Sequence, residues 1–183
     1  MVQNPTQCNT CILDTTVSDI IFDSEGECNY CKYHERMRGN FPQGKKGREE
    51  IMKLVHQIKK NQRGPYDSII GVSGGVDSTY TLYLVKKLGL NPLAVHVDNG
   101  WNSELAVSNI EKATSILGVD LFTYVVNWEE FKSLQKAFLK GSTPDIEVPT
   151  DVAIHGALYK LANKEKIKYI LGGQNFMSEG TVP

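Results

Sequence analysis

The sequence predicts an α/β protein in which a parallel sheet with its helices follows a small cysteine-bearing module. Short apolar runs alternate with amphipathic helical segments from Tyr66 onwards, a glycine-rich string follows the first run, and all four cysteines lie at or before Cys31. Strands that alternate with helices pack as a parallel sheet with right-handed crossovers. Such sheets bind ligands beyond the carboxyl ends of their strands, so we expect the site in the loops there.

The composition of the chain divides it into three parts. Residues 1–40 are polar, rich in turns and contain the cysteines, residues 41–64 form a linker and a helix, and residues 65–183 form the α/β domain. Glycine and proline mark residues 41–47 as the linker. The predicted apolar face of the helix consists of Ile51, Leu54, Val55 and Ile58.

Four short β-rich runs predict the strands of the sheet. They occupy residues 67–72, 92–97, 121–126 and 169–171. The ligand-facing loops are therefore those that follow Val72, Val97, Val126 and Leu171.

Helical periodicity predicts the segments between and beside these strands. The first helix follows the glycines, with an apolar stripe of Val76, Tyr80, Tyr83 and Leu84. The second ends at Gly118 and aligns Ala106, Ile110, Ala113 and Leu117. Asn127 with Glu130 predicts the start of a third, whose apolar face is Phe131, Leu134 and Phe138. Thr150 is the predicted cap of another, which aligns Ile154, Leu158 and Leu161.

Charge and hydropathy exclude several classes of partner. The 183 residues include 40% hydrophobic and 22% charged residues with a net charge of −1, which provides no overall field for nucleic acid or an anionic membrane. No apolar run approaches the roughly 20 residues of a spanning helix. Because the chain starts with polar residues, we expect no signal peptide. We therefore expect a cytoplasmic protein with reduced thiols, no membrane contact and no nucleic-acid partner.

The glycine loop, residues 73–78, follows the first predicted strand and consists of Ser73, Gly74, Gly75, Val76, Asp77 and Ser78. Adjacent glycines let an anion approach the main chain, and the helix that follows offers unpaired N–H groups with a partial positive charge. It is not a Walker A loop, because no Lys-Ser or Lys-Thr follows, and its adjacent glycines do not fit the dinucleotide fingerprint. A tight strand-to-helix turn with a Ser/Asp cap is the alternative.

The complete string resembles the PP-loop of the ATP pyrophosphatase superfamily, which includes GMP synthetase, NAD synthetase, argininosuccinate synthetase and tRNA-thiolating enzymes. Residues 97–100, Val-Asp-Asn-Gly, also resemble the GMP synthetase pattern. The resemblance implies a Rossmann-like adenine nucleotide alpha hydrolase domain, with adenine near Val97 and Asp98 and pyrophosphate on the glycine loop. It implies catalytic roles for Asp77 and Ser78, with Asp77 beside Mg²⁺.

The segment after the last predicted strand carries a further resemblance. Leu171-Gly172-Gly173-Gln174-Asn175, followed by Glu179, is similar to the corresponding segment of NAD synthetase-like members. The resemblance implies that Gly172 contacts the nucleotide and that Glu179 is a second magnesium ligand. An ordinary loop carboxylate is the alternative for Glu179.

The cysteines form two Cys-x2-Cys pairs, Cys8 with Cys11 and Cys28 with Cys31. This spacing is typical of a structural zinc site with four thiolates, and metal binding would supply the folding energy of so small a segment. Two redox or unrelated pairs are the alternative. His34 could replace a ligand, although four cysteines already complete a tetrahedral shell.

The cysteine segment and its order before the glycine loop resemble the N-acetyl sugar amidotransferase family. The resemblance covers roughly residues 8–180. It implies conversion of an acetamido group on a bacterial surface sugar or nucleotide-sugar to an acetamidino group. Ammonia would come from separate glutaminase subunits related to the histidine-biosynthesis synthase. That family is longer than 183 residues, so we expect this chain to be the N-terminal portion of such an enzyme.

Two other functions stay open. A tRNA-thiolating enzyme also joins cysteine modules to a PP-loop, but often needs basic surface and catalytic cysteines in the ATP domain, where this chain has none. A non-catalytic nucleotide-binding or zinc-mediated interaction module is the third reading. His96 lies in a predicted strand, where we expect a packed or edge histidine, with a catalytic histidine as the alternative. Trp101 is expected either to wall the adenine or sugar pocket or to lie in the core.

Overall fold

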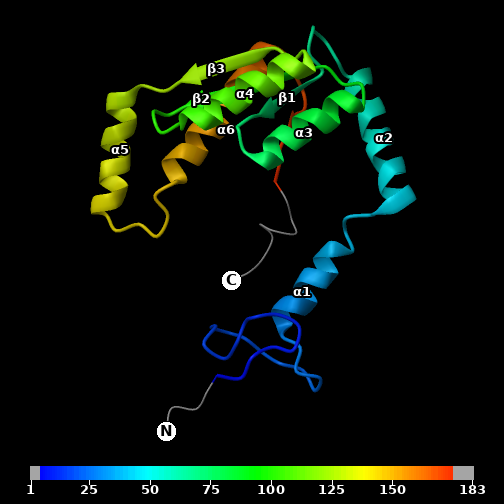
Figure 1. Cartoon of the computed structure of the whole chain (residues 1–183), viewed down its shortest axis with the longest axis vertical. Coiled ribbons are helices and arrows are strands. Elements are labelled where there is room, and N and C mark those ends of the chain that lie inside the picture. The colour runs from blue at the N-terminus through cyan, green and yellow to red at the C-terminus, as the bar shows by residue number, and fades with distance from the viewer. Residues whose placement is uncertain (1–4, 175–183) are drawn as a thin grey trace. The chain divides into compact units, whose positions relative to one another are not determined.

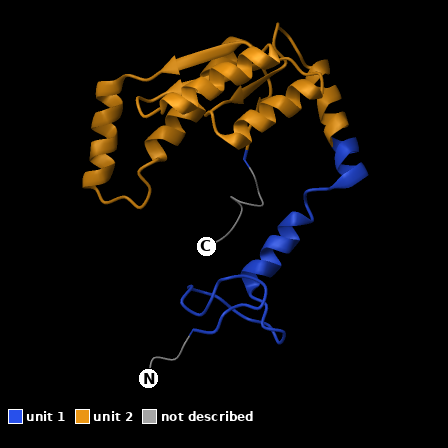
Figure 2. Cartoon of the chain, viewed as in Figure 1, with its two compact units in different colours: residues 1–50, 174–183 blue, residues 51–173 orange. Residues whose placement is uncertain are grey.

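The computed structural model describes residues 5–174 of the chain. The chain forms two compact units, the first made of residues 1–50 and 174–183 and the second of residues 51–173 (Figure 2). Each unit is described by itself below. No helix within the described residues is long and apolar enough to cross a membrane.

The first unit contains the cysteine segment and helix α1 (Asn29–Arg38) (Figure 1). The cysteine segment has two isolated antiparallel bridges and no regular strand among its described residues. The bridges pair Gln7 with Asp14 and Phe22 with Cys28. The Sγ of Cys28 caps α1 by accepting a hydrogen bond from the backbone N–H of Cys31. A cysteine expected to bind metal therefore also starts the helix.

Helix α2 (Gly44–Lys60) begins in the first unit and ends in the second. It begins within the predicted linker, residues 41–47, so the linker prediction is too long at its C-terminal side. The expected apolar face is half right: Val55 and Ile58 are buried, whereas Ile51 and Leu54 are exposed.

The second unit contains a four-stranded parallel sheet in the order β3-β2-β1-β4 (Figure 1). The strands are β1 (Ser68–Gly71), β2 (Pro92–Asp98), β3 (Leu121–Val125) and β4 (Ile170–Leu171). All three pairings are parallel, so the carboxyl ends of the four strands lie at one edge. The predicted α/β class, the parallel sheet and the four strands are confirmed.

Four helices connect these strands or lead into them: α3 (Val76–Lys87), α4 (Glu104–Leu117), α5 (Trp128–Lys140) and α6 (Val148–Lys164). Side chains cap two of them. Ser103 accepts from the N–H of Ala106 at α4, and Asn127 accepts from two N–H groups at α5, as the sequence predicts for Asn127. Thr150 is not the cap of α6, because this helix begins two residues earlier, after Glu147.

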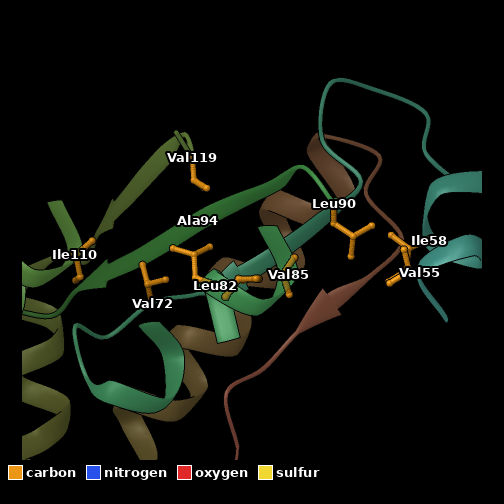
Figure 3. Close-up of a cluster of buried hydrophobic side chains, with 10 residues drawn as sticks. Val55, Ile58, Val72, Leu82, Val85, Leu90, Ala94, Ile110 and Val119 are labelled. Carbon is orange, nitrogen blue, oxygen red and sulfur yellow. The ribbon is translucent and has the colours of Figure 1, made fainter. Parts of the chain in front are cut away.

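Two hydrophobic clusters cover the two faces of the sheet. The first packs Ile70, Val72 and Ala94 against side chains of α2, α3 and α4, and includes Ile58, Leu82 and Ile110 (Figure 3). The second packs Ile69, Leu93 and Val95 against Leu158, Leu161 and Ala162 of α6. Adjacent strand residues point to opposite faces, which explains why apolar residues follow one another in β1, at Ile69 and Ile70, and in β2, from Leu93 to Val95.

The inward face of α3 differs from the prediction. Leu82 and Val85 are its buried residues, while the predicted stripe is exposed: Val76, Tyr80, Tyr83 and Leu84. The helix carries apolar residues on both of these faces, so periodicity does not select the face that packs on the sheet. The predicted face of α4 does point inward, with Ile110 buried and Ala106, Ala113 and Leu117 partly buried.

Candidate nucleotide loop and metal centre

The glycine loop leaves the sheet at the carboxyl end of β1 and leads into α3. The N–H of Val72 still bonds the carbonyl of Val95 at 2.8 Å, so the chain departs from β2 only at Ser73. Gly74 has a φ of 77° and approaches α4 so closely that a Cβ there would overlap the carbonyl oxygen of Ala106. This position therefore requires glycine. A turn without a side chain here also lets an anion approach the backbone closely.

Two serine hydroxyls face each other across the glycine loop. The Oγ atoms of Ser73 and Ser78 lie 3.2 Å apart, and Ser78 Oγ also accepts from the N–H of Ser73 at 3.2 Å. The Oγ of Ser73 accepts from the N–H of Gly75 at 3.4 Å, and Thr79 Oγ1 donates to the carbonyl of Gly75 at 2.8 Å. The loop is thus closed by its own side chains and presents hydroxyls together with backbone N–H groups.

The N-terminus of α3 has no side-chain cap. Gly75 occupies the capping position, and no side chain accepts a hydrogen bond there. The first N–H groups of a helix have no partner within it and carry the positive end of its dipole. Together with the hydroxyls of Ser73 and Ser78, this end of α3 can bind an anion. Asp77 is exposed in the same first turn.

The loop after β2 lies beside the glycine loop, because β1 and β2 are neighbours in register. Val97 is half-buried and pairs with Tyr124 of β3. The carboxylate of Asp98 accepts from the N–H of Gly100 at 2.9 Å and from Asn102 Nδ2 at 2.8 Å. Asp98 therefore stabilises the turn that follows β2 by accepting these two hydrogen bonds.

The loop after β4 also reaches the glycine loop. Gly173 packs against the first turn of α3, where a Cβ would lie 2.9 Å from the backbone nitrogen of Ser78. Gly172 is exposed directly before it. Residues 73–78 and 172 thus follow β1 and β4, and Val97 and Asp98 are the last residues of β2, at one edge of the sheet. Glu179 lies outside the described residues.

Two polar residues support the loop, and no sequence pattern predicts their contacts with it. His96 is buried, and its Nδ1 donates to the carbonyl of Val72 at 3.2 Å, which fixes the end of β1. Asn109 of α4 donates from Nδ2 to the carbonyl of Gly74 at 3.2 Å. The expectation that His96 is packed is confirmed, and its position beside the loop is new.

The four cysteines form one cluster in the first unit. Their Sγ atoms all lie within 4.8 Å of one another, and those of Cys11 and Cys28 are 3.7 Å apart. A tetrahedral zinc ion with Zn–S bonds of about 2.3 Å would hold its sulfurs about 3.8 Å apart. The cluster is therefore compatible with a four-thiolate zinc site, and the four thiols by themselves provide the complete set of ligands.

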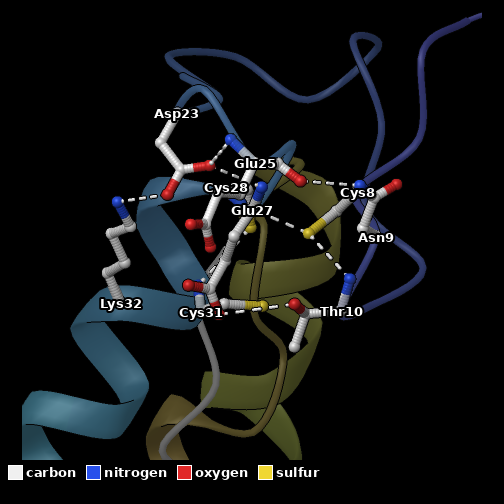
Figure 4. Close-up of polar contacts among 9 residues, drawn as sticks. All are labelled: Cys8, Asn9, Thr10, Asp23, Glu25, Glu27, Cys28, Cys31 and Lys32. Carbon is white, nitrogen blue, oxygen red and sulfur yellow. Dashed lines mark hydrogen bonds and ion pairs between the residues drawn. The ribbon is translucent and has the colours of Figure 1, made fainter.

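Backbone N–H groups point at the thiols, as in a site built for thiolates. Cys8 Sγ accepts from the N–H of Thr10 at 3.4 Å and of Cys28 at 3.2 Å (Figure 4). Burial raises the pKa of Cys8, but hydrogen bonds from Thr10, Cys11 and Cys28 outweigh it and lower this pKa to about 6. Burial raises the pKa values of Cys11 and Cys31. Metal binding would remove the protons from these thiols.

A network of acidic and amide side chains braces the segment between the cysteine pairs. Asp23 accepts from the N–H groups of Glu25 and Glu27, each at 2.9 Å, and pairs with Lys32 at 2.5 Å (Figure 4). The hydrogen bond from Lys32 holds the pKa of Asp23 at about 2. Asn9 bonds across to the carbonyl of Glu25 at 2.7 Å, which ties the first cysteine pair to the loop before the second.

Several curated proteins are similar in sequence to parts of this chain. An uncharacterized protein from Methanocaldococcus jannaschii is 32% identical over 140 residues, which are 75% of this chain and 48% of that protein. GMP synthase (glutamine-hydrolyzing) from Pyrobaculum aerophilum is 38% identical over 87 residues, 45% of this chain and 16% of that enzyme. A tRNA-specific 2-thiouridylase from Thermoanaerobacter pseudethanolicus is 31% identical over 107 residues, 48% of this chain and 28% of that enzyme.

The chain thus spans about half or less of the length of these relatives. No protein-family model matches it.

Solved structures with the same fold include two NAD synthetases. The NH3-dependent NAD synthetase from Campylobacter jejuni superposes with a TM-score of 0.52 at 16% identity, over 81% of this chain and 58% of that one. The glutamine-dependent NAD+ synthetase from Acinetobacter baumannii gives 0.55 at 19% identity, over 70% and 25%.

The parallel sheet and these likenesses point to one fold. The order of strands and helices is that of the PP-loop, Rossmann-like fold, and the four clustered cysteines fit a zinc module in front of it. The chain therefore shares its fold with NAD synthetases, and parts of it are similar in sequence to GMP synthase and to a thiouridylase.

Proposed function

We propose that this chain is part of an ATP-dependent amidotransferase that converts a sugar acetamido group to an acetamidino group and releases AMP and pyrophosphate. The observation that carries the proposal is the glycine loop. Its bare turn at Gly74, its paired hydroxyls and the uncapped start of α3 form an anion cradle at the carboxyl end of β1. ATP and nucleotide-linked sugars are cytoplasmic, so we place the reaction in the cytoplasm.

The first step activates a poor electrophile. The amide oxygen attacks the α-phosphorus of ATP, the bond between the α- and β-phosphates breaks, and pyrophosphate leaves. The N–H groups at the start of α3 and the hydroxyls of Ser73 and Ser78 would hold the departing pyrophosphate and stabilise its charge. Val97 and Asp98 would border adenine, and Gly172 would border the nucleotide from β4.

Asp77 would hold Mg²⁺ beside this cradle. It is exposed in the first turn of α3, and magnesium bound to substrate phosphates needs only one or two protein carboxylates. The ion would neutralise charge on the phosphates. Glu179 is the second proposed ligand.

The second step exchanges oxygen for nitrogen. The lone pair of ammonia forms a bond to the activated carbon, the carbon–oxygen bond breaks, and AMP leaves with the former amide oxygen. The protein's part is to exclude water and to hold the acceptor in line. We propose that ammonia comes from separate glutaminase subunits related to the histidine-biosynthesis synthase. The glutamine-hydrolyzing GMP synthase among the relatives supports an amide-derived nitrogen source.

The cysteine cluster would bind a structural zinc ion through Cys8, Cys11, Cys28 and Cys31. All four ligand positions are filled by protein thiolates, which leaves no open position for substrate. We therefore assign this metal to the folding of the first unit and not to the chemistry.

Product analysis tests the proposed function. The protein is incubated with ATP, Mg²⁺, ¹⁵N-ammonium and UDP-N-acetylglucosamine as a representative acceptor, and the nucleotides and sugar are followed by ³¹P NMR and mass spectrometry. We expect AMP and pyrophosphate in equal amounts, with one ¹⁵N in an amidine product. Formation of ADP would contradict adenylation, and AMP without ¹⁵N in the sugar would contradict this acceptor.

The similarity to a thiouridylase supports a second candidate, a tRNA-thiolating enzyme. Against it, residues 32–183 contain no cysteine, so this part of the ATP unit offers no thiol to carry sulfur. Binding of tRNA with a steep dependence on salt would favour this candidate. A non-catalytic module is the third possibility, and calorimetry that finds no binding of ATP or AMP at millimolar concentration would favour it.

A further inference from the structure

Two tryptophans meet at the edge of the sheet where the glycine loop lies. Trp101 follows the carboxyl end of β2, and Trp128 is the first residue of α5, after the end of β3. Their ring centroids are 5.6 Å apart and the rings are inclined by 71°, an edge-to-face arrangement. Trp101 is 66% exposed and Trp128 is 37% exposed, which excludes the core position, one of the two alternatives for Trp101.

Both rings are held in place although they are exposed. The indole N–H of Trp101 donates to Gln135 Oε1 at 2.7 Å, and its backbone N–H donates to Asn99 Oδ1 at 3.1 Å. The ring of Trp128 lies against Gly100, where a Cβ would come within 2.7 Å of a ring carbon. Large apolar rings normally gain free energy by burial, so two fixed and exposed rings at a binding edge indicate a surface shaped for a ligand.

This aromatic corner, Trp101 with Trp128, lies within reach of the proposed reaction centre. Ala106, only five residues after Trp101, packs on Gly74 of the glycine loop. Five residues of extended chain span at most about 18 Å, and residues from Glu104 onwards are helical and shorter. A sugar in the corner could therefore place its acetamido group near a phosphate on the loop.

We propose that the aromatic corner binds the pyranose ring of the acceptor sugar. The inference rests on the proposed function. The C–H bonds on one face of a pyranose carry partial positive charge and match the negative face of an indole ring. The side chains around the corner include neutral amides that can bond sugar hydroxyls, from Asn99, Asn102 and Gln135.

The inclination of the rings distinguishes a sugar from adenine. A flat base can stack on only one of two rings that meet at 71°. A chair-shaped pyranose is thicker: one ring can take its C–H face while the other takes its rim or the methyl of its acetyl group. Adenine remains beside Val97 and Asp98 in this arrangement.

The chain offers its own probe for this site. It contains two tryptophans, and both belong to the corner, so fluorescence excited at 295 nm reports on these rings. The ligand would be the methyl glycoside of N-acetylglucosamine, added after the nucleotide site is filled with α,β-methylene-ATP. Calorimetry under the same conditions measures sugar binding independently of fluorescence.

The variants are Trp101→Ala, Trp101→Phe and the control Tyr159→Ala. Tyr159 on α6 is an aromatic residue with the same exposed fraction as Trp101, 66%. We expect the sugar to change wild-type emission and Trp101→Ala to weaken sugar binding roughly 5- to 20-fold. Trp101→Phe should restore most of the affinity, and affinity for the nucleotide should not change. Tyr159→Ala should leave both affinities unchanged.

Three results would overturn the inference. If Trp101→Ala weakens nucleotide binding and spares the sugar, the corner belongs to adenine. If the sugar binds by calorimetry but neither emission nor Trp101→Ala responds, the sugar lies elsewhere and the proposed function survives. If wild-type protein binds no acetamido sugar by calorimetry, the proposed acceptor fails and this inference fails with it.

Discussion

Gly173 lies directly against Ser78: a Cβ on Gly173 would be 2.9 Å from the backbone nitrogen of Ser78 and 3.0 Å from its Cα. The atoms in the way are backbone atoms of the first turn of α3, which cannot turn aside as a side chain can. The loop after β4 therefore sets the position of the N–H groups proposed to hold pyrophosphate. This contact joins two parts of the chain that lie far apart in sequence.

We predict that Gly173→Ala weakens ATP binding about tenfold or more, because the added methyl displaces the start of α3 from its anion-binding geometry. Isothermal titration with ATP and Mg²⁺ measures this. Gly156→Ala is the matched control, since a Cβ at Gly156 in α6 meets nothing within 4 Å and alanine favours a helix by about 0.5–1 kcal/mol. Equal ATP affinity in the two variants would contradict the role given to Gly173.

Asp77→Asn should abolish most turnover while leaving the fold intact. Asp77 is exposed, and an acidic residue in the first turn of a helix contributes only about 0.3–1 kcal/mol to stability. Loss of a charge that positions Mg²⁺ should reduce kcat by roughly 100-fold or more. The readout is pyrophosphate release at saturating Mg²⁺, with thermal unfolding as the check on folding.

Glu104→Gln provides the control for Asp77→Asn. Glu104 is also the acidic residue in the first turn of a helix, α4, and is exposed. It should keep normal turnover. If Asp77→Asn turns over normally at saturating Mg²⁺, Asp77 has no metal role; if both variants lose activity alike, the effect is one of helix charge.

Local patterns predicted much of this molecule. The glycine loop, the cap at Asn127 and the spacing of the cysteine pairs are short-range features, and the structure places each as expected. The inward face of α3 was predicted wrongly because Tyr80 and Tyr83 look as suitable for burial as Leu82 and Val85. Only the packing of the helix against Ile110 and the sheet decides between these faces.

The supporting contacts of the site could not be predicted, because they join residues distant in sequence. Gly173 contacts Ser78 only because β4 pairs with β1. His96 contacts the carbonyl of Val72 only because β2 also pairs with β1. No periodicity carries such information. Trp101 was ambiguous for the same reason, since its exposure depends on the position of Trp128.

Removal of zinc should unfold the first unit selectively. The cysteine segment has two isolated bridges and one short helix, and Cys28 both belongs to the thiol cluster and caps α1. Chelation or Cys28→Ser should therefore abolish zinc content, expected at one ion per chain, and reduce helical circular dichroism. The second unit has its own hydrophobic clusters and should keep its thermal transition.

Added zinc should restore the chelated wild-type protein but not Cys28→Ser, which separates metal loss from general damage. Metal analysis and far-ultraviolet circular dichroism follow both states. Retention of the full helical signal after complete metal removal would show that the first unit folds without zinc. Loss of the second unit's transition at the same time would show that the metal stabilises the whole chain.

The hydrogen bond from Tyr66 Oη to Asp120 Oδ2, 2.8 Å long, should make the second unit less stable at high pH. This bond raises the pKa of Tyr66 above its ordinary value of 10.0. Because the folded protein holds the phenol proton more tightly than the unfolded chain, the stabilisation is complete below pH 10 and is lost as pH rises through the folded-state pKa.

Thermal unfolding between pH 8 and pH 11 measures this effect. At pH 8 the melting temperature of the wild type should be higher than that of Tyr66→Phe, and the difference should become smaller towards pH 11. Tyr159→Phe, which removes an exposed hydroxyl from α6, should follow wild type throughout. A constant gap between wild type and Tyr66→Phe across this range would mean that the hydroxyl contributes through packing and not through its proton.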